Sequence, residues 1–282
     1  MRHIRTAQIT GRFIKDADNI GYANESRLVI MSNAFVNPYV PRKRVNKAII
    51  SKNSSYEIYK TLQDYGIEII LMEANPFLPK PLACHVDMQL VNVSEGVLIY
   101  ARGISHDTLL NLKKTGYELI EGSVYASDRY PFDIAYNCAI VGKNAFLNPK
   151  YTDPITLEII KKAGIKIYHV KQGYAKCSTC IVSEEAIITA DSHIYAKALE
   201  AKIDALLIRP QSNILLPGYN YGFIGGSCGL LSDNELAFFG EIEYLIDAEA
   251  IIDFCKKYGK NILPLLKGPV TDLGGLFPLS TV

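Results

Sequence analysis

One sequence pattern recurs five times along the chain of 282 residues, and it constrains the fold more than any other feature. In each copy ten mainly apolar residues precede a polar turn, and successive turns lie 41 to 49 residues apart. The copies end before Ser94, Gly142, Ser183, Ser232 and Ser280, and they read CHVDMQLVNV, FDIAYNCAIV, GYAKCSTCIV, GFIGGSCGLL and VTDLGGLFPL. A period of this length is typical of repeat architectures, in which each unit buries an apolar face against its neighbour.

The residues after each of the first four turns also repeat, as an apolar strand, an amphipathic helix and a second strand. Residues suited to helix N-caps and to left-handed positions after helix ends flank these helices: Ser105, Asp153 and Asp247 before them, and Gly116, Gly164 and Gly259 after them. The sequence therefore predicts repeated ββαβ units of the α/β class.

The fifth copy reaches the end of the sequence before its helix, and the missing half is found near the N-terminus. A strand is expected over residues 27–35, a helix over 54–66 and a strand over 67–72. We expect the C-terminal strand, residues 275–279, to pair with this N-terminal unit and to remove the last open edge. The prediction is a five-bladed α/β propeller of five ββαβ repeats, forming one domain over residues 26–282 after an N-terminal arm over residues 1–25.

Composition limits the partners and the compartment. With 49% apolar and 21% charged residues the chain is typical of a globular protein, and a net charge of +1 does not favour nucleic acid or a membrane surface. No apolar run is long enough to span a bilayer, and the N-terminus lacks a signal-peptide core. Six cysteines are too few for a disulfide scaffold, which favours a reducing, cytoplasmic location. The oligomeric state is left open.

Residues with ionisable or nucleophilic side chains precede the polar turns. In the first copy His85 and Asp87 flank one residue, and alternation along a strand would place both side chains on one face. If the repeats surround one axis, equivalent positions of all five copies meet at a common mouth. A proton-handling or ligand-binding pair is the sharper interpretation, and a His that caps backbone groups beside Asp87 is the plainer one.

Five ββαβ units with this His-x-Asp motif resemble the pentein family of guanidino-group modifying enzymes, which includes arginine deiminase, agmatine deiminase, dimethylarginine dimethylaminohydrolase and amidinotransferases. The family also contains a non-enzymatic ribosome anti-association factor. The resemblance covers about residues 27–282. It implies that His85 is the general acid or base, that Asp87 holds the guanidinium group, and that a cysteine attacks the guanidinium carbon.

The sequence departs from the family at the nucleophile. The family's cysteine lies near the C-terminus, where this chain reads TDLGGLFPLSTV, with Ser280 at the turn and no cysteine. A site rotated around the pseudo-fivefold axis can restore a thiol opposite His85. The candidates are Cys177 or Cys180 from CSTC, with Lys176 expected to favour the thiolate of Cys177, and Cys228 from GGSCG. The plainer interpretation of these cysteines is core packing, and the glycines are explained by close strand approach.

Further polar residues lie in the same ten-residue segments before the turns. Besides Asp87, the carboxylates of Asp133 and Asp272 can hold a cationic substrate, and the amides of Gln89 and Asn137 can add hydrogen bonds. The expected partner is a small molecule, cationic in character, bound in the axial mouth.

Three functions stay open, so whether the chain is an enzyme is undecided. The first is a hydrolase or amidinotransferase-type enzyme that acts on a guanidino or related C–N bond. The second is an inactive pentein-like module that binds a small molecule or a protein, and the third, ranked last, is a metal site built from Cys and His. Neither GxxxxGK[ST] nor GxGxxG is present at the glycine cluster, so no nucleotide is expected there, and we predict no cofactor and no metal.

Overall fold

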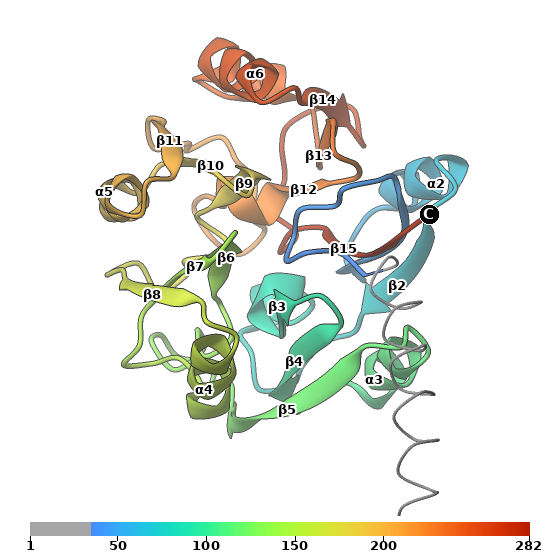
Figure 1. Ribbon diagram of the computed structural model, residues 1–282. Coiled ribbons are helices and arrows are strands. Elements are labelled where there is room, and N and C mark those ends of the chain that lie inside the picture. The colour runs from blue at the N-terminus through green and yellow to red at the C-terminus, as the bar shows by residue number, and fades with distance from the viewer. Residues whose placement is uncertain (1–34) are drawn as a thin grey trace, which may run out of the picture.

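The computed structural model describes residues 35–282, and their strands form five separate three-stranded sheets (Figure 1). Four sheets come from consecutive stretches of chain and repeat one order of elements. In that order the first two strands are antiparallel, and a helix then leads to a third strand parallel to the second. The elements are β3 (Leu90–Ser94), β4 (Val97–Arg102), α3 (His106–Lys113), β5 (Glu118–Tyr125), β6 (Ala139–Val141), β7 (Asn144–Leu147), α4 (Pro154–Lys162), β8 (Lys166–His169), β9 (Cys180–Ser183), β10 (Ala186–Thr189), α5 (Ser192–Glu200), β11 (Asp204–Leu207), β12 (Cys228–Leu230), β13 (Glu235–Phe238), α6 (Ala248–Lys257) and β14 (Asn261–Pro264).

The fifth sheet joins the two ends of the described chain. Strand β15 (Phe277–Thr281) lies antiparallel to β1 (Val45–Ser51), which is parallel to β2 (Glu68–Met72) across helix α2 (Tyr56–Asp64). The predicted pairing of the C-terminal strand with the N-terminal unit is therefore confirmed. The predicted first strand, over residues 27–35, falls almost wholly outside the described residues, and only Phe35 forms a bridge, with Ser280. The strand that pairs with β15 instead begins directly after the loop of Arg42–Arg44.

The sheets surround a central region, and helices α2 to α6 lie at the periphery (Figure 1). The first strands β3, β6, β9 and β12 are almost entirely buried, whereas the third strands β5, β8, β11 and β14 keep exposed positions. This gradient explains the composition of the repeats, because the segment before each polar turn must be apolar to lie at the centre.

The expected helix ends are present, although the caps differ. Asp153 accepts from the backbone N–H of Thr156, and so satisfies a donor that the first turn of α4 leaves free. Ser105 and Asp247 occupy the N-cap positions of their helices without a side-chain cap bond. The glycines after the helices, Gly66, Gly116, Gly164 and Gly259, all have positive φ.

The predicted boundary between residues 25 and 26 lies outside the described residues. Among the helices in residues 35–282, none has both the length and the apolar character that crossing a bilayer requires.

Candidate functional site

The His-x-Asp motif lies on a tight turn rather than on the strand predicted for it. Residues Val86–Met88 form a 3₁₀ turn, and β3 begins only at Leu90. The N–H of His85 donates to Leu82 O, and that of Asp87 donates to Gly274 O, so the turn is held from both sides. The two side chains still face each other, but the turn, and not strand alternation, places them together.

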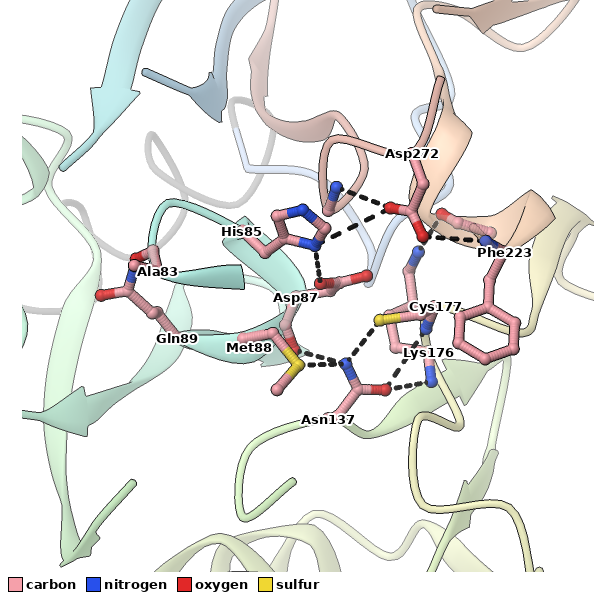
Figure 2. Close-up of polar contacts among 12 residues, drawn as sticks. Ala83, His85, Asp87, Met88, Gln89, Asn137, Lys176, Cys177, Phe223 and Asp272 are labelled. Carbon is pink, nitrogen blue, oxygen red and sulfur yellow. Dashed lines mark hydrogen bonds and ion pairs between the residues drawn. The ribbon is translucent and has the colours of Figure 1, made fainter. Parts of the chain in front are cut away.

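His85 lies between two buried carboxylates (Figure 2). Its Nδ1 is 3.9 Å from Oδ1 of Asp87 and 3.7 Å from Oδ1 of Asp272, and all three side chains are almost fully buried. Gly274 packs directly against the imidazole-bearing residue, because a Cβ added there would overlap the Cβ of His85. The glycine has a φ of 80°, a conformation that glycine adopts without strain.

The two carboxylates have different surroundings. Asp272 accepts hydrogen bonds from the backbone N–H groups of Phe223, at 2.8 Å, and Gly274, at 3.0 Å. Burial raises its pKa and the Asp87 charge adds to this, while His85 and the two N–H groups oppose the rise. By contrast, no N–H or O–H group among the described residues donates to either carboxylate oxygen of Asp87, which contacts the Cys177 thiol, and Nδ1 of His85 has no hydrogen-bond partner among them. A buried carboxylate without a donor is costly, so this arrangement is suited to a cationic ligand.

Asn137 connects the thiol of Cys177 to the His-x-Asp turn (Figure 2). Its Nδ2 lies 3.0 Å from the Asp87 carbonyl oxygen, 3.2 Å from the sulfur of Met88 and 3.0 Å from Sγ of Cys177. Its Oδ1 accepts from the backbone N–H groups of Lys176 and Cys177. One amide therefore fixes both the thiol-bearing loop and the turn of the neighbouring repeat.

The electrostatic surroundings of Cys177 disfavour its thiolate. Burial, then the charges of Asp87 and Asp272, and then a hydrogen bond to the Asp87 carboxylate raise the pKa of this thiol well above its ordinary value, while the Asn137 amide lowers it. The expectation that Lys176 activates Cys177 is wrong. The Lys176 amine donates to Gly225 O and lies over the rings of Tyr39 and Phe277, and its charge lowers the pKa of Cys180 instead.

The other two candidate thiols lie in separate surroundings. Cys180 is hydrogen-bonded to Cys228, and this contact together with burial raises the Cys180 pKa well above normal. Cys180 and Cys228 begin the innermost strands of two sheets, so core packing accounts for both. Cys177 is thus the candidate thiol whose contacts include residues of the His-x-Asp site.

Two further candidates lie beside the site rather than in it. Gln89 donates to the carbonyls of Glu73 and Ala83, which braces the approach to the turn. Asp133 accepts from the Tyr174 hydroxyl at 2.6 Å, and burial raises the pKa of this carboxyl although that hydrogen bond opposes the rise. At the C-terminal position where the family resemblance implies a cysteine, the chain places the buried apolar residues Leu276 and Phe277.

Two pockets reach the site, one lined by Cys177 and the other by His85. A pocket of about 230 Å³ contains Cys177 and Asp272, and its other lining residues are Leu82, Tyr174, Leu216, Tyr219, Asn220, Tyr221 and Phe223. A second pocket of about 360 Å³ contains His85 and Asp272, with Ser51, Asn53, Lys80, Pro81, Leu216, Pro217, Gly218 and Leu273. Asp272 and Leu216 line both, so the two pockets meet at the carboxylate opposite His85.

The sequence indicated that the segment YNYGF, Tyr219–Phe223, could line a rim, and Tyr219, Tyr221 and Phe223 do line the first pocket. Tyr174 was not selected. It holds the same position in its repeat as His85 and Phe223 do in theirs, and this position was the signal that could have found it. For the third hypothesis the structure gives no support: residues 35–282 contain no group of three or more His, Cys, Asp or Glu side chains arranged to hold a metal ion.

Comparison with solved structures defines the class of fold. Inosamine-phosphate amidinotransferase from Streptomyces griseus superposes with a TM-score of 0.53 and 10% identity, covering 88% of this chain and 97% of that one. C. jejuni agmatine deiminase gives a TM-score of 0.51 and 10% identity, covering 82% of this chain and 90% of that one. The chain thus has the mixed α/β, pentein-like fold that its sequence repeats and His-x-Asp motif indicated.

Sequence comparison gives the family. Residues 49–277 match the sequence model of a family of unknown function, DUF6873, and the chain belongs to that family. A search of curated protein sequences found no match.

Proposed function

We propose that this protein modifies a guanidino or amidino group of a small molecule, with Cys177 as the nucleophile. One observation carries the proposal: no N–H or O–H group among the described residues donates to the buried Asp87 carboxylate, which lies against the Cys177 thiol and beside His85. A planar guanidinium ion supplies several N–H donors and a positive charge, which are what Asp87 and Asp272 require.

The ligand's charge activates the thiol. Without ligand, the two carboxylates raise the pKa of Cys177 and keep it a neutral thiol. A guanidinium ion bound between them offsets both charges, and an adjacent cation lowers a thiol pKa. The thiol is therefore protected from general alkylation and oxidation until a cationic ligand is bound.

In the first half of the reaction, Sγ of Cys177 forms a bond to the guanidinium carbon and one C–N bond breaks. The thiol proton passes to the departing nitrogen, so a neutral amine or ammonia leaves and an S-amidino cysteine cation remains. His85 lies between the two carboxylates and accepts and returns this proton as general acid and base.

The second half decides between hydrolysis and transfer. Water adds to the S-amidino carbon, the S–C bond breaks, one proton returns to sulfur and a second is released, giving a urea product. If an acceptor amine adds instead, the amidino group moves to that amine and the sulfur takes back one proton. Both outcomes stay within the proposal.

We also propose that the five sheets close into a five-bladed propeller. The pairing of β15 with β1 and the pentein-like fold support this closure. The cytoplasmic location, and the absence of nucleic-acid and membrane partners, stay predictions from composition.

The test is labelling with a cationic alkylating reagent. Chloroacetamidine carries an amidinium group beside its reactive carbon, and iodoacetamide is a neutral control. We expect chloroacetamidine at neutral pH to label Cys177 selectively, as intact mass and peptide mapping would show, and methylguanidine to slow this labelling.

The C177S variant should lose the label, whereas C180S, a matched change at a buried cysteine outside the site, should retain it. Labelling distributed over several cysteines, or unchanged in C177S, would contradict the assignment of the nucleophile. If methylguanidine protects Cys177 but no guanidino compound is ever turned over, the molecule is the inactive binding module of the second hypothesis.

A further inference from the structure

The pocket that contains Cys177 is mainly apolar, although the Asp272 carboxylate also lines it. Six of its nine lining residues are aliphatic or aromatic: Leu82, Tyr174, Leu216, Tyr219, Tyr221 and Phe223. The remainder are Cys177, Asp272 and Asn220, so the lining contains no Lys, Arg or His. A ligand group that enters this pocket meets apolar surface and finds no cation to pair with a carboxylate.

The aromatic side chains form a continuous wall. The ring centroid of Tyr174 lies 5.6 Å from that of Tyr130 and 5.9 Å from that of Phe223, and Tyr221 lies 5.9 Å from Phe223. The backbone N–H of Phe223 also donates to Asp272. The wall and the carboxylate are therefore fixed relative to one another, as a site that binds two chemically different ends of one ligand requires.

Among the residues that line the two pockets, the lysine contacts only the second pocket. Lys80 belongs to the pocket that contains His85, not to the pocket that contains Cys177. The pocket volume of about 230 Å³ exceeds the roughly 150 Å³ cavity that accommodates benzene in an engineered protein, so a ring of that size fits.

We propose that the natural ligand is a guanidino compound whose substituent is uncharged and apolar, an arylalkyl or alkyl group seated against Tyr174, Tyr221 and Phe223. This inference rests on the proposed function, because it assumes that the guanidinium group lies between Asp87 and Asp272. It disfavours guanidino acids, whose carboxylate would find no cation in this pocket, and substituents that carry a second ammonium group.

Calorimetric titration of the C177S variant tests this without interference from turnover. The probes are methylguanidine, phenethylguanidine, agmatine and 3-guanidinopropionate. We expect phenethylguanidine to bind at least about tenfold more tightly than methylguanidine, since each buried methylene is worth roughly fourfold in affinity. Agmatine and 3-guanidinopropionate should bind no more tightly than methylguanidine.

Exposed tyrosines provide the matched variants. Tyr221 and Tyr244 are each 51% exposed, but only Tyr221 lines the pocket. In the C177S background, Y221A should weaken phenethylguanidine roughly fivefold and leave methylguanidine unchanged, whereas Y244A should change neither.

The outcomes separate the two proposals. If methylguanidine does not bind at all, the proposed function fails and this inference fails with it. If methylguanidine binds but phenethylguanidine gains nothing, or agmatine or 3-guanidinopropionate binds most tightly, the apolar substituent is refuted while the guanidinium site stands. An equal effect of Y221A on both ligands would likewise refute it.

Discussion

Replacing Asp87 by asparagine is expected to change the reactivity of Cys177 in opposite directions toward two reagents. The substitution keeps the shape of the side chain and removes one negative charge beside the thiol. Burial is the largest cause of the raised pKa of Cys177, and the Asp87 charge comes next. D87N therefore lowers the thiol pKa, but it also removes one of the two groups that would attract a cationic reagent.

The magnitudes follow from charge and distance. A charge within about 4–6 Å shifts a pKa by roughly 1–3 units, and we take one unit because burial is unchanged. One unit gives about tenfold more thiolate, but the less basic thiolate is a weaker nucleophile, so alkylation by neutral iodoacetamide rises roughly threefold. The lost attraction for chloroacetamidine is roughly 3–4 kcal/mol at an effective dielectric constant of 20. Half of that value, about 2 kcal/mol, is a thirtyfold loss, and the threefold gain leaves a net decrease of roughly tenfold.

The assay is the second-order rate of labelling at Cys177 at pH 7.5 with each reagent, measured by mass spectrometry on intact protein. D133N is the matched control, because Asp133 is also a buried carboxylate but its charge is not among the causes that act on Cys177. Its two rates should stay within about twofold of wild type, given the screening of distant charges. Rates that move in the same direction in D87N, or that do not move, would refute the placement of Asp87 beside the thiol.

Three further results are expected. D87N should raise the unfolding temperature by about 2–4 °C per kcal/mol gained, because a buried carboxylate that accepts from no N–H or O–H group among the described residues costs about 1–3 kcal/mol. A lower temperature in a calorimetric scan would show that the thiol and His85 already offset this cost. G274A should destabilise the fold by more than the roughly 1–2 kcal/mol that a left-handed alanine costs, because its Cβ would overlap His85. It should also abolish labelling of Cys177 by chloroacetamidine. In the control G164A, the glycine also has positive φ but faces open space, so this variant should lose only the backbone contribution and should be labelled normally. Burial raises the pKa of Asp133, so the protonated carboxyl stabilises the fold below its unfolded pKa, and that contribution is lost as pH rises through the folded value. D133N should therefore be more stable than wild type in urea unfolding at pH 7 but not at pH 4. A stability advantage of D133N that persists at pH 4 would count against burial as the cause.

The five sheets could be predicted because the strand before each polar turn must be apolar throughout, and such runs are visible in sequence. Strand β1 was not predicted, because its segment lacks a long apolar run of this kind. It directly follows the proline and three basic residues of PRKR, and its apolar run is only Ala48–Ile50. Its identity as a strand comes from pairing with β15 and β2, which lie far away in sequence.

Much of the site could also be predicted, since equivalent positions of a repeat converge. Asn137 and Cys177 were selected from their copies, and the structure joins them to the His-x-Asp turn. The local conformation could not be predicted, because a turn of three residues has no periodicity of its own. The direction of the Lys176 side chain depends on which carbonyl and rings lie within its reach, and that is fixed only by tertiary packing.

Strand β15 also determines when the fold can be completed during synthesis of the chain. A ribosome makes β1 and β2 long before β15, so the antiparallel edge of β1 must wait for the far end of the chain. Asp272, the second carboxylate at His85, belongs to the same late segment. A chain released before that segment therefore lacks one sheet strand and half of the cation site together. Quality control that recognises an exposed strand edge would thus remove the same molecules that are unable to bind ligand.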